Sequence, residues 1–118
     1  MISREKIFAY VKEAYGVDPD YPWPKYPTYA VLRHPQNRKW FGVVMQIAAS
    51  SLNLDSSEKI DVINLKCDPF LLGELLREPG FYPAYHMSKE HWFTLRLGAP
   101  PATEKVFALI DLSHQLTS

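Results

Sequence analysis

Residues 29–48 read YAVLRHPQNRKWFGVVMQIA, and this stretch predicts a β-hairpin. Its two ends, 29–34 and 40–48, are rich in β-branched and aromatic residues, which favour strands. The segment 35–38 between them has the composition of a turn. The second strand alternates two sets of side chains, which are Phe41, Val43, Met45 and Ile47 on one side and Trp40, Gly42, Val44 and Gln46 on the other. We therefore expect an antiparallel pair with a basic tip.

Two more strands are predicted downstream of this hairpin. Residues 60–67 alternate apolar and polar side chains, and residues 92–97 do the same. A period of two residues indicates a strand with one buried face. Between the two strands, Asp68 and Pro69 form a strong helix start, because Asp caps a helix and Pro suits its first position. A short helix is expected to follow and to end before Pro79.

Helices are also predicted at both ends of the chain. Ser3 is a suitable cap for a helix over residues 4–15, and Gly16 is suited to end it. Thr103 is expected to cap a last helix, whose apolar side would carry Val106, Phe107, Ile110, Ser113 and Leu116. The predicted order is α-β-β-β-α-β-α. Alternating strands favour an α+β fold with an antiparallel sheet of about four strands, helices on one face and the other face open.

Length and composition limit the domain count and the compartment. The 118 residues suit a single domain spanning 1–118. Cys67 is the one cysteine, so no intramolecular disulfide can form, which is typical of a reducing compartment. Charged residues at 4–6 precede any apolar run, so we expect no signal peptide. No stretch approaches the ~20 apolar residues of a membrane span. We expect a cytoplasmic protein that does not contact membranes.

The charge is balanced overall but uneven along the chain. Thirteen basic and 13 acidic residues give a net charge of zero, which argues against a strong, indiscriminate nucleic-acid binder. Between Asp20 and Asp55, however, there is no carboxylate. The basic residues within that interval are Lys25, Arg33, Arg38 and Lys39. The predicted hairpin therefore lies in a locally basic part of the chain.

Residues capable of catalysis or metal binding do not form a recognisable set. His86 and His91 are five residues apart, which suits neither one face of a helix nor one side of a strand, and no second cysteine completes a zinc site. Cys67 is expected to end a strand on its apolar face, as a small buried side chain. Glu90 and His91 are adjacent and would seldom converge. We predict no metal, no cofactor and no enzymatic activity.

Two segments have the composition of binding surfaces. The hairpin tip, residues 33–40, joins basic side chains to a tryptophan and could lie along a phosphate backbone; the alternative is an ordinary solvated turn. Residues 81–92 are dense in aromatic side chains, which can stack on bases; the alternative is a loop folded back onto the core. Residue chemistry alone leaves both alternatives open.

Several strings carry a resemblance to a known family. They are WPKYP at 23–27, YAVLRH at 29–34, NRKW at 37–40, NLKCDP at 64–69, PAYHM at 83–87, Lys89 with HW at 91–92, and DLS at 111–113. The chain resembles the MmcQ/YjbR-like family of small bacterial proteins over nearly its whole length. It departs from that pattern at Ser88, where Asn is expected, and at His114, where Tyr is expected.

The resemblance implies a CyaY-like fold and a DNA-binding role with a double-wing arrangement. The first hypothesis is therefore a non-enzymatic DNA-binding or regulatory domain that holds DNA weakly through phosphates, with the hairpin tip as a wing. The residues expected to contact DNA are Arg33, Arg38, Lys39, Trp40, Lys66, Tyr85, Lys89 and Arg96. The alternative is a module that binds a protein partner or a small ligand through the aromatic loop 81–92 and the open sheet face.

Overall fold

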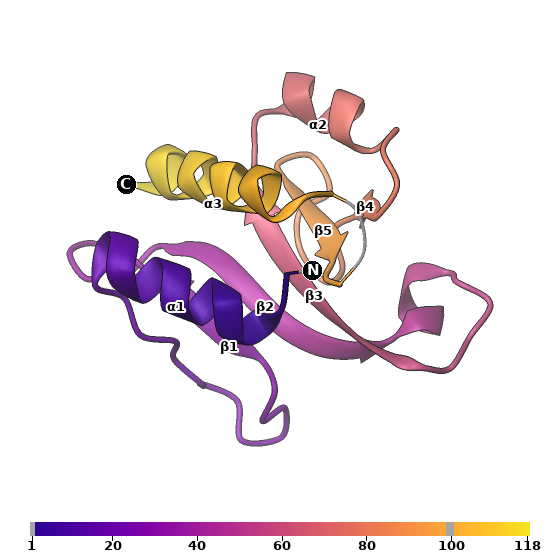
Figure 1. Cartoon of the computed structure of the whole chain (residues 1–118), viewed down its shortest axis with the longest axis horizontal. Coiled ribbons are helices and arrows are strands. Elements are labelled where there is room, and N and C mark those ends of the chain that lie inside the picture. Colours follow the sequence, from indigo (N-terminus) through magenta and orange to yellow (C-terminus); the bar gives the residue numbers. More distant parts are fainter. Residues whose placement is uncertain (1, 99–100) are drawn as a thin grey trace.

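The structure is a computed structural model that describes residues 2–98 and 101–118 (Figure 1). These residues form the following elements: α1 (Arg4–Tyr15), β1 (Ala30–Arg33), β2 (Trp40–Ala48), a 3₁₀ helix η1 (Ala49–Leu52), β3 (Lys59–Lys66), α2 (Pro69–Leu75), β4 (Phe81–Pro83), β5 (Trp92–Arg96) and α3 (Thr103–Thr117). The predicted order is confirmed, with one short strand added before β5. None of the helices in the described ranges combines the length and apolar character that a bilayer span requires.

The described strands make one antiparallel sheet in the order β1-β2-β3-β5-β4. The additional strand, β4, lies at the edge and pairs with β5. It is three residues long and ends in Pro83, and proline is tolerated in sheets at edges because it cannot donate to a ladder. So short a segment has no alternation to read, which explains why the sequence predicts a loop there.

Helices α1 and α3 lie side by side over one face of the sheet, and α2 lies beyond α3 (Figure 1). Ser3 caps α1 by accepting from the Lys6 amide, and Gly16 ends it with φ 67°, a left-handed conformation that glycine adopts without strain. Asp68 caps α2 as predicted, by accepting from the Leu71 amide. The core between helices and sheet includes these fully buried side chains: Ile7, Val11, Leu32, Phe41, Val44, Ile63, Leu65, Phe93, Leu95 and Ile110.

The last helix differs slightly from its prediction. Thr103 is its first residue, and Ala102 occupies the cap position without a side-chain hydrogen bond. Leu116, expected on the apolar side, is 43% exposed, whereas Leu109 is buried. The predicted positions Val106, Ile110 and Ser113 are buried as expected.

A β-bulge in the hairpin reverses part of the predicted alternation. Leu32 pairs with Gly42 but Arg33 pairs with Trp40, so Phe41 is an extra residue on β2. Phe41 therefore packs in the core under the helices, whereas Val43 belongs to a second cluster on the other face. An inserted residue shifts the period of two by one position, which the pattern alone did not reveal.

The outer face, meaning the face of the sheet away from α1 and α3, was predicted to be open but is partly covered. Its buried cluster consists of Val31, Val43, Met45, Ile47, Ala49, Ile60 and Val62. The side chains packed over this cluster are Trp23, Tyr29, Trp40, Leu52, Leu54, Tyr85 and Met87. Most of the covering residues come from two loops, and these loops shape the site described next.

Candidate functional site

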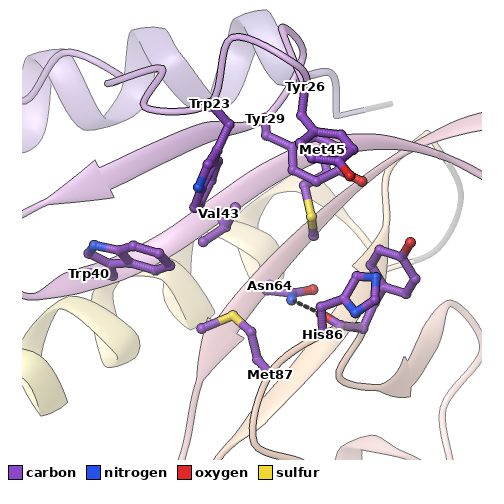
Figure 2. Close-up of a pocket in the computed structure, with 10 residues that line it drawn as sticks. Trp23, Tyr26, Tyr29, Trp40, Val43, Met45, Asn64, His86 and Met87 are labelled. Carbon is purple, nitrogen blue, oxygen red and sulfur yellow. Dashed lines mark hydrogen bonds between the residues drawn. The ribbon is translucent and has the colours of Figure 1, made fainter.

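A pocket of about 320 Å³ lies on the outer face, between the proline-rich loop before β1 (residues 18–29) and the loop between β4 and β5 (residues 84–91) (Figure 2). Its lining consists of Trp23, Tyr26, Tyr29, Trp40, Val43, Met45, Asn64, Tyr85, His86 and Met87. Small-molecule sites typically occupy roughly 300–1,000 Å³ and are mainly apolar with a few polar groups. This cavity, called here the aromatic pocket, has the size and the lining of such a site.

The proline-rich loop supplies one wall of the aromatic pocket. Backbone hydrogen bonds in both directions join Asp20 to Val31, so the loop starts as an addition to the edge of β1. The chain then turns back over the sheet and brings Trp23 to Trp40, whose rings meet edge to face with centroids 5.6 Å apart. Proline-restricted backbone and aromatic contact together hold this wall in place without a ligand.

Tyr26 and Tyr29 continue that wall. Their rings are stacked with centroids 4.9 Å apart, and the rings of Tyr29 and Trp23 meet edge to face with centroids 6.2 Å apart. Burial raises the pKa of the Tyr29 phenol, and the neighbouring Tyr85 phenol adds to the rise. Tyr29 therefore stays protonated at neutral pH and keeps a hydroxyl group that can donate a hydrogen bond.

A buried polar network beneath the pocket positions the opposite wall. The Asn64 side chain donates to the backbone carbonyl of Tyr85 at 2.9 Å, and its amide oxygen accepts from the Thr94 hydroxyl at 2.5 Å. The Tyr85 amide donates back to the Thr94 oxygen at 2.9 Å. Asn64 and Thr94 have no exposed surface, so these bonds satisfy groups that would be costly to bury unpaired. They fix the backbone at Tyr85.

The opposite wall itself is formed by Tyr85, His86 and Met87. His86 has φ 58°, a left-handed conformation that is uncommon for a residue other than glycine. Its ring lies 4.0 Å from the ring of Tyr85. Figure 2 shows His86 and Met87 facing Trp23 and Trp40 across the cavity. Backbone strain of this kind occurs preferentially at ligand sites, where the surrounding structure holds it.

The residues predicted to contact DNA lie at several places in the structure. Trp40 and Tyr85 line the aromatic pocket. The guanidinium of Arg33 lies 5.4 Å from the Trp40 ring centroid and forms an ion pair with Asp20 at 2.9 Å, so much of its charge is neutralised. Lys89 lies in the loop after β4, where its ammonium donates to a backbone carbonyl at 2.8 Å.

The other predicted DNA contacts lie in β3, in β5 and at the hairpin tip. Lys66 and Arg96 occupy opposite ends of the β3–β5 pairing. Arg38 and Lys39 are exposed at the hairpin tip. The tip does not project freely, because the Asn37 side chain donates to the carbonyl of Thr117 at the end of α3.

Sequence reasoning missed the residues that complete the pocket. The sequence predicts no binding role for Trp23 or Tyr26, and it places Tyr29 and Asn64 only as positions of predicted strands. The density of aromatic residues near 23–29 was the available signal. Their convergence with residues 85–87 depends on the path of two loops, which has no local sequence signature.

Other candidates for chemistry do not assemble. Within residues 2–98 and 101–118, no group of three or more His, Cys, Asp or Glu side chains is placed to hold a metal ion. Cys67 is buried at the end of β3, as predicted, and burial raises the pKa of its thiol to about 11. The absence of a metal, a cofactor and catalysis stays an expectation.

Comparison with known proteins places the chain among relatives that match almost end to end. "Uncharacterized protein YyaQ" of Bacillus subtilis (strain 168) is 45% identical over 117 residues, covering 99% of both chains. A crystal structure of a Pseudomonas syringae protein has a TM-score of 0.97 at 43% identity, covering 99% of this chain and 100% of that one.

A crystal structure of a Deinococcus radiodurans protein shares the fold, with a TM-score of 0.75 at 19% identity over 98% of this chain and 78% of that one. The more specific expectation of a CyaY-like fold stays a prediction. Residues 12–116 match the family described as YjbR, and the chain therefore belongs to the YjbR family.

Proposed function

We propose that this domain is a non-enzymatic binding module whose aromatic pocket takes a flat, largely apolar small molecule. The observation that carries the proposal is the pocket itself, in which five of the ten lining residues are Trp or Tyr. Ring faces at fixed positions bind flat ligands by stacking and by burial of apolar surface. Val43 and Met45 supply an apolar floor.

The walls of the aromatic pocket are ordered before a ligand binds, which supports the same proposal. The rings of Trp23, Trp40, Tyr26 and Tyr29 already contact one another, and Asn64 already holds the backbone of Tyr85. A ligand would therefore pay little conformational entropy to order the walls. Binding rather than catalysis is proposed because Asn64 and Thr94, the buried polar groups beneath the cavity, already serve to position a wall.

Two neutral bicyclic probes, 3-indolepropanol and 2-naphthalenemethanol, test this function. Titration into the ¹⁵N-labelled protein should shift the amide signals of Asn64, Tyr85 and His86. Tyr26→Ala should weaken binding by about twofold to tenfold, since an aromatic contact contributes about 0.5–1.5 kcal/mol.

Tyr21→Ala is the matched control for that variant. Both tyrosines are in the proline-rich loop and are about equally exposed, 49% for Tyr21 and 52% for Tyr26, but only Tyr26 lines the pocket. The proposed function is wrong if neither probe shifts those three amides, or if the two variants weaken binding equally.

DNA binding is a second candidate, and one observation favours it. Arg38 and Lys39 are exposed at the hairpin tip, and neither has an ion-pair partner among the described residues. Basic side chains in such a position can contact phosphates without reading sequence. Titration of a fluorescent DNA duplex at low salt tests this function, and a lack of binding there would exclude it.

A further inference from the structure

A second hollow of about 280 Å³ adjoins the aromatic pocket. Its lining consists of Ser51, Leu52, Asn53, Tyr82, Pro83, Ala84, Tyr85, His86 and Lys89. Tyr85 and His86 line both cavities, so they form the partition between them. A ligand that occupies both cavities would have to pass these two residues.

The two cavities differ in chemistry. The aromatic pocket contains no Lys, Arg, Asp or Glu among its lining residues. The second hollow contains one formally charged lining residue, Lys89, together with the polar side chains of Ser51 and Asn53. A ligand that fills both would present an apolar ring to the first cavity and a polar group to the second.

Lys89 is held at this position by the fold. Its ammonium donates a hydrogen bond of 2.8 Å to the carbonyl of Ala84, which is itself fully buried. A lysine ammonium has three N–H donors, and this contact uses one of them. The other two have no hydrogen-bond acceptor among the described residues and are available to an acidic group of a ligand.

The sign of the local charge favours an anion over a cation. Five aromatic residues could in principle form a cage for a quaternary ammonium group, because ring faces attract cations. However, neither cavity is lined by a carboxylate, and the lysine next to the partition would repel a second positive charge. Arg33, whose guanidinium lies over the Trp40 ring, is paired with Asp20 and does not line either cavity.

His86 lies at the partition in a strained backbone conformation, with its side chain exposed. Its position on the boundary of both cavities lets an imidazole N–H donate to the polar part of a bound ligand. This adds a second donating side chain to that of Lys89.

We propose that the ligand spans both cavities, with a flat aromatic ring in the aromatic pocket and an anionic group, on a short spacer, at the Lys89 ammonium. This inference rests on the proposed function, because it assumes that the aromatic pocket binds a ring. It adds the sign of the ligand's charge and the residue that recognises it.

Three probes that share one ring and differ in charge test the inference. They are 3-indolepropionate, 3-indolepropanol and 3-indolepropylamine, measured with the full-length protein by calorimetry and by ¹H–¹⁵N NMR. The carboxylate should bind about fivefold more tightly than the alcohol, which is the upper range for one exposed ion pair, and the amine should bind more weakly than the alcohol. The advantage of the carboxylate should shrink with added salt.

Variants at position 89 assign the effect to one residue. Lys89→Met should abolish the difference in affinity between carboxylate and alcohol, and Lys89→Arg should retain it. Lys25→Met is the matched control, because Lys25 is an exposed lysine that lines neither cavity. It should leave the difference intact.

The outcomes separate this inference from the proposed function. If the alcohol shifts the pocket amides and the carboxylate binds no more tightly, the inference is wrong and the proposed function stands. If the amine binds more tightly than the alcohol, the ligand of this site is cationic and the inference of an anionic group is wrong. An advantage that persists in Lys89→Met, or disappears in Lys25→Met, would overturn the role of Lys89. If neither these three probes nor 2-naphthalenemethanol binds, the proposed function itself fails.

Discussion

The hydroxyl of Tyr10 in α1 donates a hydrogen bond of 2.7 Å to the carboxylate of Asp111 in α3, although 101 residues separate them. Tyr15, one turn later in α1, donates to the same carboxylate. The rings of both tyrosines stack on α3, Tyr10 on Phe107 at 4.0 Å and Tyr15 on His114 at 3.7 Å. Asp111 therefore joins the two helices that cover the inner face of the sheet.

Stability should fall at alkaline pH because of this cluster. Burial, with the bond to Asp111 as the second cause, raises the pKa of Tyr10 from 10.0 to about 12, and the pKa of Tyr15 rises as well. The folded state therefore favours the protonated phenols. Their stabilisation is complete below about pH 10 and is lost as pH rises towards 12 and beyond. Thermal melting between pH 8 and pH 12 measures this loss.

Asp111→Asn should lower the free energy of unfolding at neutral pH by about 1.5–3 kcal/mol, the range for hydrogen bonds to charged groups. The difference in unfolding free energy between variant and parent should narrow above about pH 10. In the parent the Asp111 carboxylate then repels the phenolates, whereas the variant has no charge at this position. Asp18→Asn is the control. Asp18 forms an exposed ion pair with Lys12, so its replacement should lower the free energy of unfolding by no more than about 1 kcal/mol. Parallel pH profiles of parent and Asp111→Asn would contradict this account.

Acid should also destabilise the fold, through two histidines. His34 is buried and its ring lies 4.2 Å from the ring of His114, which stacks on Tyr15. Burial lowers the pKa of both, against a smaller opposite effect of Asp111 on His114. Neutral histidines therefore stabilise the folded state above about pH 6.5, and that stabilisation is lost as pH falls through their lower folded pKa values.

His114→Phe should retain the stack on Tyr15 and remove one of the two titrating groups. We expect its unfolding free energy to fall less steeply than the parent's between pH 6.5 and pH 4.5. His91→Gln, at an exposed position in the loop before β5, should leave the pH dependence unchanged. A steeper acid loss in His114→Phe than in the parent would show that the interpretation is wrong.

The sequence predicted what depends on local periodicity and capping. Alternation over residues 60–67 located β3 within one residue at each end, and Asp68 with Pro69 located the start of α2. It did not reveal the bulge at Phe41, because one inserted residue leaves the composition of a strand unchanged. Nor could it place Trp23 against Trp40, since that contact depends on how Asp20 pairs with the edge of β1.

Cys67 should react slowly with a thiol reagent. Its side chain is 1% exposed, and burial, with Asp68 as the second cause, raises the pKa of the thiol to about 11. The reactive thiolate is therefore scarce at pH 7, and the reagent cannot reach it without local opening. Labelling of the native protein should be much slower than in denaturant. Equal rates in the two conditions would refute the buried position.

The hairpin tip offers the sharpest test of DNA binding. Each phosphate contact contributes about −0.9 to the slope of log K against log salt on duplex DNA. Replacing Arg38 and Lys39 together should therefore flatten the slope by up to about 2 units. Arg38 has φ 65°, so Arg38→Asn is preferable to alanine there, because Asn tolerates left-handed backbone. Lys39→Gln completes the variant, whose stability should change by about 0.5 kcal/mol or less.

The control for this variant is Lys12→Gln. Lys12 is exposed on α1 and pairs with Asp18 at 3.0 Å. Helix α1 covers the inner face of the sheet, away from the outer face that carries the aromatic pocket (Figure 1). Its loss should leave the salt slope nearly unchanged. If the double variant keeps the full slope, phosphate contacts come from elsewhere, and Lys66 and Arg96 are the next residues to replace. If DNA binding instead competes with 3-indolepropanol, the DNA contact surface overlaps the aromatic pocket.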